Sequence, residues 1–395
     1  MDLEGAGDRP PVDGNVPGGV RRRAVGPVRY LLYLACGAAA AYQIVAILAA
    51  LRHRLTPAPP PPPEYPPVSI LKPVYGRDPH FYRAIRTHAE QAYPNVEILF
   101  GAHSLDDPAV PEIRRLIAEF PHRDIRLIVS TRETLNAKVG TLIDLAREAR
   151  HQILLVNDAD IEVPPGYLKD VVAALLQPGT GLATCLYAAV GDTLPAKWEA
   201  LGITADFAPS VLVAPFVGVR EFGLGSTLCF HRKHLDAIGG FEALADYIAD
   251  DYQLAKRITS QGLAARLAKP AVLTHIAGTW TNVWRHQLRW ARTIRVSRGD
   301  GYAGLPVTHA GLWALIALLA GQPVIAAALA AVRIASGLAT GVLILRRFWL
   351  LAVAPLIPLW DLWAFVIWIA GLAGNEIDWR GERLTVTPSG QLRAQ

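Results

Sequence analysis

Two long apolar segments flank a polar middle region in this chain. The first segment covers residues 29–51 and carries no charged residue after Arg29. A helix rises ~1.5 Å per residue, so this length is enough to cross the hydrocarbon core of a bilayer. The second segment fills residues 305–374, and the whole chain is 52% hydrophobic, which is high for a water-soluble protein. We therefore predict one N-terminal membrane helix, a folded middle region and a C-terminal membrane region.

We divide the second apolar segment into about three spans, at residues 305–321, 323–345 and 348–372. The first of these is short, and Arg333 and Asp361 interrupt the other two. Arg346 and Arg347 separate the last two spans. The positive-inside tendency places these two arginines, and the middle region with them, on the cytoplasmic side. The sequence therefore predicts a multi-pass membrane protein with a cytoplasmic middle region.

Three further segments differ in composition from the spans. Residues 1–28 are rich in Gly, Pro and Arg, and we predict that they are disordered. Residues 52–67 form a Pro-rich linker, which favours a stiff polyproline conformation that holds the next domain off the membrane. Residues 375–395 form a tail, for which we predict a small hairpin packed on a membrane face.

Charge and cysteine content narrow the classes of partner. The net charge is +5, and the arginines cluster near the ends of the apolar segments. Anionic lipid headgroups or a nucleotide explain this pattern better than nucleic acid does. Cys36, Cys185 and Cys229 are isolated and show no CxxC spacing, so the sequence indicates neither a disulfide framework nor a zinc site.

Short apolar runs recur through the middle region, residues 68–304. They begin at Val68, Val96, Ile125 and Ile153, which are 28, 29 and 28 residues apart, and helix-like stretches lie between them. This spacing is typical of βαβ units, so we predict an α/β fold with a doubly wound, mostly parallel sheet. Ligands of such sheets bind beyond the carboxyl ends of the strands.

Asp158 and Asp160 directly follow the fourth apolar run. In an extended strand tip alternate side chains point the same way, so both carboxylates could face one cation. Hard oxygen ligands suit Mg2+ or Mn2+ bridging a diphosphate. The alternative is a structural turn before a helix that starts at Pro164 and Pro165, because acidic residues are common there.

Two other acidic pairs have both a structural and a chemical interpretation. Asp106 and Asp107 can cap a helix that begins near Val110, or can accept hydrogen bonds from a nucleotide. Asp250 and Asp251 can open a helix. Their apolar flank can instead raise the pKa of one carboxyl and make it a general base. Spacing does not choose within this pair, and we favour Asp251.

The segment 282–296 mixes tryptophans with four arginines. One interpretation is an amphipathic helix at the membrane interface, where both residue types are favoured. The other has Arg289 on a phosphate and Trp290 stacked in an active site, while the remaining arginines hold the helix to the membrane. The two interpretations are compatible.

Taken together, these motifs resemble the ceramide glucosyltransferase family of GT-A glycosyltransferases, most closely its bacterial branch associated with hopanoid biosynthesis. The resemblance covers residues 68–304 and rests on SILKPVYGRDP, YPNVEILFGA, DDPA, NDADI, YIADDYQLAKR and HQLRWARTIR. It implies a membrane-bound, inverting enzyme. Such an enzyme transfers one sugar, glucose or N-acetylglucosamine, from a UDP-sugar to a hydroxyl of a lipid acceptor, ceramide or a hopanoid polyol.

The resemblance also implies roles for the donor site. Asp107 or Asp106 would contact the nucleotide, and Asp158 and Asp160 would hold a divalent cation and the diphosphate. Asp158 would thereby count among the nucleotide-binding residues. Weaker candidates for nucleotide contacts are Lys72, Asn136 and Lys138.

A second set of roles concerns catalysis. By the same resemblance Asp251, with Asp250 beside it, would be the base, and Arg289 and Trp290 would complete the family's arginine–tryptophan motif. His286 stands where the family usually has Gln or Arg. We expect His286 to contact the acceptor or a phosphate.

Two other functions stay open. A processive polysaccharide synthase shares the acidic and arginine–tryptophan motifs, but it generally needs more spans to form an export channel. A non-catalytic membrane scaffold that binds a nucleotide or anionic lipid is the second alternative, because each acidic cluster has a capping explanation. A product assay separates all three.

Overall fold

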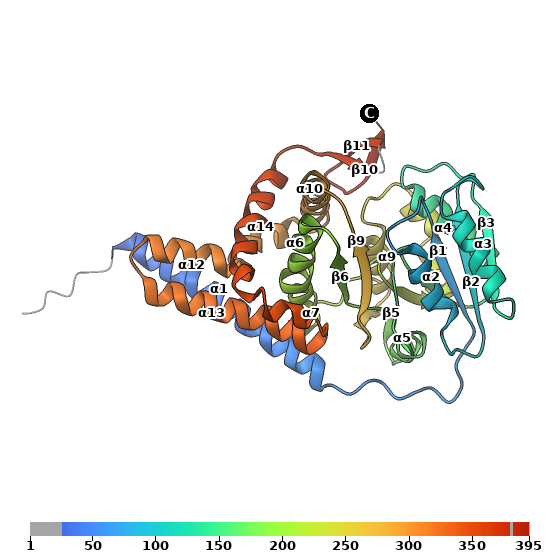
Figure 1. Ribbon diagram of the computed structural model, residues 1–395, viewed down its shortest axis with the longest axis horizontal. Coiled ribbons are helices and arrows are strands. Elements are labelled where there is room, and N and C mark those ends of the chain that lie inside the picture. Colours follow the sequence, from blue (N-terminus) through green and yellow to red (C-terminus); the bar gives the residue numbers. More distant parts are fainter. Residues whose placement is uncertain (1–25, 380–381, 395) are drawn as a thin grey trace, which may run out of the picture.

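The computed structural model describes residues 26–379 and 382–394 (Figure 1). A bundle of apolar helices extends to one side of a mixed α/β domain, and the chain passes from one part to the other several times. The segment 1–28, which we predict to be disordered, lies outside the described residues up to residue 25. Pro27 and Val28 belong to the first helix, α1 (Pro27–Leu55).

In the described part of the chain the central sheet has seven strands in the order β3-β2-β1-β4-β7-β5-β8. Its strands are β1 (Val68–Pro73), β2 (Val96–Ala102), β3 (Asp124–Val129), β4 (Ile153–Val156), β5 (Thr180–Thr184), β7 (Leu228–His231) and β8 (Ala264–Leu267). The first four run parallel, and β7 is antiparallel to both of its neighbours. The predicted mostly parallel α/β fold is confirmed, because the 28- and 29-residue spacing marks β1 to β4.

Helices cover both faces of this sheet, with a separate apolar core on each side. The helices are α2 (Phe81–Ala89), α3 (Val110–Glu119), α4 (Ala137–Glu148), α5 (Tyr167–Leu175), α8 (Arg232–Ala237) and α9 (Asp250–Thr259). On β1, Ile70 packs into the core beneath α2, α3 and α5, while Leu71 packs into the core beneath α4, α8 and α9. This strand is buried on both faces, as expected for a parallel sheet.

A second layer lies between the sheet and the apolar helices (Figure 1). It contains the parallel pair β6 (Tyr187–Gly191) and β9 (Val272–Ile276). The surrounding helices are α6 (Leu194–Gly202), a π-helical turn (Ile203–Phe207), α7 (Ala208–Phe216) and α10 (Trp280–Ser297). This layer joins the sheet to the apolar helices and carries the segment 282–296 on α10.

Within the described residues, three helical segments are long and apolar enough to cross a membrane: Val28–Leu55, Pro323–Ile344 and Ala354–Leu372. The helices α11 (Gly299–Thr308) and α12 (Ala310–Leu319) form a pair bent by 49° that could be a fourth span. The last two segments contain α13 (Pro323–Leu338) and α14 (Ile357–Leu372). One N-terminal and two or three C-terminal apolar helices are therefore present, in agreement with the prediction.

The two charges that interrupt the C-terminal spans form a buried ion pair. Arg333 Nη2 lies 2.8 Å from Asp361 Oδ1, and Arg333 Nη1 donates to the Ala205 carbonyl at 2.7 Å. Asp361 Oδ2 accepts the Gly311 amide at 2.8 Å. Because each charge also has backbone partners, the pair joins α12, α13, α14 and the π-helical turn without leaving a bare charge among apolar residues.

The linker and the tail both lie close to the rest of the protein. The last turns of α1 pack directly against α7, with Ala49 and Ala50 in one apolar cluster with Leu212. The tail forms a three-stranded antiparallel sheet, one strand more than the predicted hairpin, with strands β10 (Glu376–Trp379), β11 (Glu382–Val386) and β12 (Leu392–Ala394). It packs on the segment before α9 and so borders the site described next.

Candidate active site

The acidic pair after β4 turns away from the strand direction. β4 ends at Val156, and residues 159–160 form a turn, so the two carboxylates are not on an extended tip as expected. Asp158 Oδ1 lies 2.8 Å from Lys138 Nζ. The Asp160 carboxylate instead accepts a hydrogen bond from the Thr274 hydroxyl on β9. The turn predicted by the structural interpretation is therefore present, and the two side chains contact different partners.

Lys138 connects this turn to the start of α9. Its Nζ also lies 3.1 Å from Asp250 Oδ2, so one cation bridges two carboxylates. Asn136 fixes this geometry, because its Oδ1 caps α4 and its Nδ2 donates to the Tyr247 carbonyl at 2.8 Å. Burial lowers the pKa of Lys138, but the nearby carboxylates outweigh burial and raise it overall. The lysine therefore stays charged.

Asp251 is half-buried in the first turn of α9. Its Oδ2 accepts the Gly225 amide at 3.0 Å, and its Oδ1 accepts the Tyr252 amide at 2.7 Å. Burial and the charge of Asp250 raise the pKa of Asp251 to about 6, against the opposing effect of Lys138. The helix begins at Asp250, so the two aspartates open it as the structural interpretation predicted, although its N-cap residue, Ala249, has no capping side chain.

A glycine turn holds the two acidic segments together. The Gly225 carbonyl accepts the Asp158 amide at 3.2 Å, while the Gly225 amide binds Asp251. A Cβ at Gly225 would lie 2.9 Å from Asp158 Oδ2. Residues 225–226 form a turn, and the close approach of Asp158 explains the glycine.

Lys72 lies beneath the same loop. It is fully buried, and its Nζ donates to the Asp158 carbonyl at 3.1 Å and lies 3.5 Å from His88 Nε2. Burial lowers its pKa to about 7, although the charges of Asp160 and Asp158 act against this shift. Lys72 therefore contacts the backbone of the acidic turn from the core side.

The acidic pair after β2 lies in the loop that leads to α3. Asp107 Oδ2 accepts the Gly76 amide at 2.8 Å, and Asp107 Oδ1 accepts the Ala109 amide at 2.8 Å. These bonds tie the loop after β1 to the loop after β2 and shape the turn before α3. Asp106 is exposed. Asp107 thus has a structural function in this loop, and Asp106 is open to solvent.

The arginine–tryptophan segment on α10 packs against α6. His286 Nδ1 lies 2.6 Å from the buried carboxylate oxygen Glu199 Oε1, and Gln287 Nε2 donates to the same oxygen at 2.7 Å. Trp290 packs between His286 and Phe207, with ring centroids 4.6 and 5.6 Å away. Arg289 is half-buried on the same helix. The ring of Trp290 is thus fixed from two sides.

The arginines after Trp290 bind protein rather than reaching for the bilayer. Arg292 Nη2 donates to the Ala373 carbonyl at 2.9 Å, and Arg295 Nη2 donates to the Gly374 carbonyl at 2.7 Å. These carbonyls follow the C-terminal end of α14, where cations are favoured. Arg292 and Arg295 therefore anchor α10 to the end of the last span.

Comparison with known proteins decides the family. Residues 31–392 match the description of glycosyl transferase family 21. This chain belongs to that family. It is 27% identical over 246 residues to ceramide glucosyltransferase 1 of Caenorhabditis elegans, covering 61% of this chain and 52% of that protein. A ceramide glucosyltransferase of Komagataella phaffii is 29% identical over 121 residues, which is 29% of this chain and 24% of that protein. The chain thus spans about half the length, or less, of these curated relatives, and the predicted family is confirmed.

A solved structure shares the fold of this family 21 protein. The mannosyltransferase PcManGT from Pyrobaculum calidifontis, in complex with GDP-Man and Mn2+, aligns with a TM-score of 0.54 and 21% identity. The alignment covers 87% of this chain and 97% of the mannosyltransferase. This likeness supports the GT-A type of fold.

Two residues of the candidate active site were not identified from the sequence. Tyr187 on β6 lies between the acidic cluster and α10. Burial raises its pKa well above the usual value, and the charges of Asp251, Asp158 and Glu199 add to the effect. Glu199 is a buried carboxylate in a helix that otherwise buries small and apolar residues. A single acidic residue among small and apolar ones could have indicated Glu199 from the sequence. Nothing in the sequence around Tyr187 indicates a site residue.

Asp158 and Asp160 are the carboxylates of the turn after β4, and their side chains contact Lys138 and Thr274 respectively. No group of three or more potential metal ligands occurs among the described residues. Mg2+ is commonly bound by one or two carboxylates plus substrate phosphates and water. Burial and the charge of Asp158 raise the pKa of Asp160 to about 6, so a cation here would relieve an unfavourable negative charge.

Proposed function

We propose that this protein is a membrane-bound, inverting hexosyltransferase that transfers one sugar from a UDP-sugar to a hydroxyl of a membrane lipid. The observation that carries the proposal is the partly buried carboxylate cluster around Lys138, which lies at the carboxyl edge of the sheet. The ceramide glucosyltransferases among its relatives support glucose as the sugar and ceramide as the acceptor. N-acetylglucosamine is the second sugar that we propose to test. A hopanoid polyol is the second acceptor that we propose to test.

In this reaction Asp251 acts as the base. Its carboxylate removes the proton of the acceptor hydroxyl while that oxygen attacks the anomeric carbon. The bond from this carbon to the diphosphate breaks, UDP leaves with the electron pair, and the configuration inverts. A carboxyl with a pKa of about 6 is deprotonated at neutral pH yet basic enough to take a proton in the transition state. Asp250 supports this function by raising the pKa of Asp251.

The donor side uses the turn after β4. Asp158 and Asp160 would hold Mg2+ or Mn2+, which supplies positive charge to the departing diphosphate when bound. Arg289 adds a cationic side chain on the facing helix. Asp107 or Asp106 contacts the nucleotide. Three residues that the sequence suggested as nucleotide contacts hold the acidic turn and the start of α9 in position: Lys72, Asn136 and Lys138.

The acceptor side faces the apolar helices. His286 and Trp290 form its wall together with Phe207 and Tyr187, whose rings lie 5.2 Å apart. The polar hydroxyl of a lipid held at the membrane surface would enter between this wall and Asp251. We further propose that the active site faces the cytoplasm, in a bacterial inner membrane, because Arg346 and Arg347 follow the span Pro323–Ile344.

The test is a product assay on membranes that contain the full-length protein. Each reaction combines Mg2+ or Mn2+, UDP-glucose or UDP-N-acetylglucosamine, and ceramide or a hopanoid polyol, and lipids are analysed by mass spectrometry. We expect a glycolipid with one added sugar, and none from membranes with Asp251→Asn. A high-molecular-weight polymer would instead establish a polysaccharide synthase. Nucleotide binding without any sugar transfer would establish a scaffold.

A further inference from the structure

A cleft of about 600 Å³ lies apart from the carboxylate cluster, where two apolar helices meet the α/β domain. One wall comes from the end of α1 with Arg54, and another from the turn at Arg346 and Arg347. The loop before β9 contributes Lys269, and the domain side is formed by α2 and by residues 162–165. Apolar residues such as Leu343 line the part nearest the spans.

The lining of this cleft carries more positive than negative charge. The four cations Arg54, Lys269, Arg346 and Arg347 face two carboxylates, Glu90 and Glu162. Both carboxylates already have basic partners on the domain: Glu90 lies 2.6 Å from Arg86, and Glu162 lies 2.9 Å from Arg83 and 2.8 Å from His275. An anion would therefore be attracted to this cleft.

Two of these cations are held in place by backbone oxygens. Lys269 Nζ donates to the His53 carbonyl, and Arg347 Nε donates to the Leu345 carbonyl at 3.1 Å. Burial lowers the pKa of both, and the charge of Arg54 lowers that of Lys269 further. Arg346 adopts a φ of 55°, a conformation that is sparsely populated without glycine and that is found at ligand sites.

The cleft lies at the level where the spans leave the membrane. Arg54 is the second-last residue of the span Val28–Leu55, and Arg346 follows the end of the span Pro323–Ile344 by two residues. Both helices reach the α/β domain at these ends (Figure 1). Lipid phosphates occupy this depth in a bilayer, and the apolar lining adjoins the acyl chains.

We propose that this basic cleft binds the phosphate of an anionic membrane lipid, with Arg54, Lys269 and Arg347 as the contacting cations. The site is separate from the carboxylate cluster and does not depend on the proposed reaction. It is connected to that cluster through β9, because Leu273 pairs with Glu162 by two backbone hydrogen bonds of 2.9 Å and the next residue, Thr274, binds Asp160. A bound lipid would thus hold the loop that supports the acidic turn.

The experiment measures binding alone, so its result is independent of any transfer assay. Full-length protein in neutral detergent is titrated with short-chain phosphatidylglycerol, short-chain phosphatidylcholine or inorganic phosphate, and bound lipid is counted by native mass spectrometry. The test variants are Lys269→Gln and Arg54→Gln. Arg54 is exposed at a helix end, so its variant is expected to fold even if Lys269→Gln does not.

Arg52→Gln is the matched control, because Arg52 lies two residues from Arg54, does not line the cleft, and sits over the Phe216 ring at 5.6 Å. We expect saturable phosphatidylglycerol binding that is about fivefold weaker in each test variant and unchanged in the control. Equal affinity for phosphatidylcholine, or equal loss in Arg52→Gln, would overturn the proposal. Inorganic phosphate that binds as tightly as the lipid would also overturn it, since the cleft would then be a simple anion site.

Discussion

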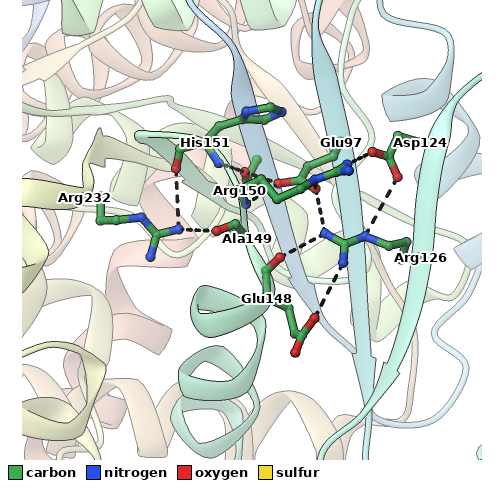
Figure 2. Close-up of polar contacts among 9 residues, drawn as sticks. Glu97, Asp124, Arg126, Glu148, Ala149, Arg150, His151 and Arg232 are labelled. Carbon is green, nitrogen blue, oxygen red and sulfur yellow. Dashed lines mark hydrogen bonds and ion pairs between the residues drawn. The ribbon is translucent and has the colours of Figure 1, made fainter.

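The two edges of the central sheet bury carboxylates in opposite ways. At the amino edge Glu97 is fully buried and receives Arg126 at 2.7 Å, Arg150 at 2.9 Å and the Ser69 hydroxyl at 2.5 Å (Figure 2). At the carboxyl edge several aspartates gather around Lys138. Glu97 has two arginines of its own. Asp158 and Asp250 share one lysine, and Asp251 accepts two backbone amides.

The pKa values record this difference. Burial alone would raise the pKa of Glu97, but the bonds from Ser69, Arg150 and Arg126 outweigh it and lower the pKa to about 2. At the other edge burial and neighbouring carboxylates raise the pKa of Asp251 to about 6. A carboxylate with its own arginines stabilises the fold, whereas a carboxylate with a raised pKa keeps basicity and negative charge for a substrate and a cation. Each prediction below tests this contrast.

The largest effect is expected from Asp251→Asn. An amide cannot take the hydroxyl proton, so we expect the rate of sugar transfer to fall at least about 100-fold. Binding of UDP-sugar, measured by calorimetry, should remain. Asp246→Asn is the control, because Asp246 is an exposed carboxylate in the segment before α9, and its rate should match the wild type. Transfer near the wild-type rate in Asp251→Asn would remove Asp251 as the base.

At the amino edge the expected effect is on stability. Glu97→Gln removes the buried carboxylate that Arg126 and Arg150 share and leaves them only more exposed ones such as Asp124. We therefore expect the free energy of unfolding to fall by about 2–3 kcal/mol. The matched control is Glu148→Gln, because Glu148 pairs with the same Arg126 at 3.6 Å but is 56% exposed. Its cost should be below about 0.5 kcal/mol. Equal melting temperatures for the two variants in detergent would show that the Glu97 network is not structural.

The two edges should also respond to pH separately. The folded pKa of Glu97 lies below its ordinary value, so its contribution is complete above about pH 4.5 and is lost as the pH falls towards 2. Asp251 takes up a proton as the pH falls through about 6. Between pH 7 and 5 we therefore expect transfer to fall about tenfold while circular dichroism stays constant, and to recover on return to pH 7. A rate that stays constant down to pH 4.5 would contradict the assigned pKa.

Local patterns in the sequence predicted the first half of the fold. The apolar runs that start at Val68, Val96, Ile125 and Ile153 are strands because a buried parallel strand needs a short apolar run and little else. The same local patterns identified the acidic pairs. They placed these residues after strands or at a helix start. Local sequence does not determine which distant residues these side chains contact.

The rest depends on contacts between segments far apart in the chain. Lys138 was identified, but its position between Asp158 and Asp250 depends on α4, β4 and α9 together. The turn at Asp160 depends on Thr274, which comes 114 residues later. Arg333 and Asp361 were seen as interruptions of two spans, and nothing local shows that they face each other. Pairings of this kind need the tertiary structure.

The smallest effect is expected from Gly225→Ala, a change in the turn that contacts Asp158. Gly225 has a backbone that alanine can adopt, so the only cost of Gly225→Ala is a Cβ 2.9 Å from Asp158 Oδ2. The carboxylate must move by a few tenths of an ångström. We expect transfer to fall about threefold to tenfold, and half-maximal activity to require more Mn2+, because the displaced oxygen belongs to the proposed cation site.

Gly304→Ala is the control for that change, since nothing lies within 4 Å of a Cβ at Gly304. Its kinetic parameters should equal those of the wild type. The Mn2+ dependence separates two explanations, because a general loss of stability would lower the rate at all Mn2+ concentrations alike. An unchanged Mn2+ requirement in Gly225→Ala would place the cation away from Asp158. The carboxylates at this edge that act on the substrate would then be Asp250 and Asp251 alone.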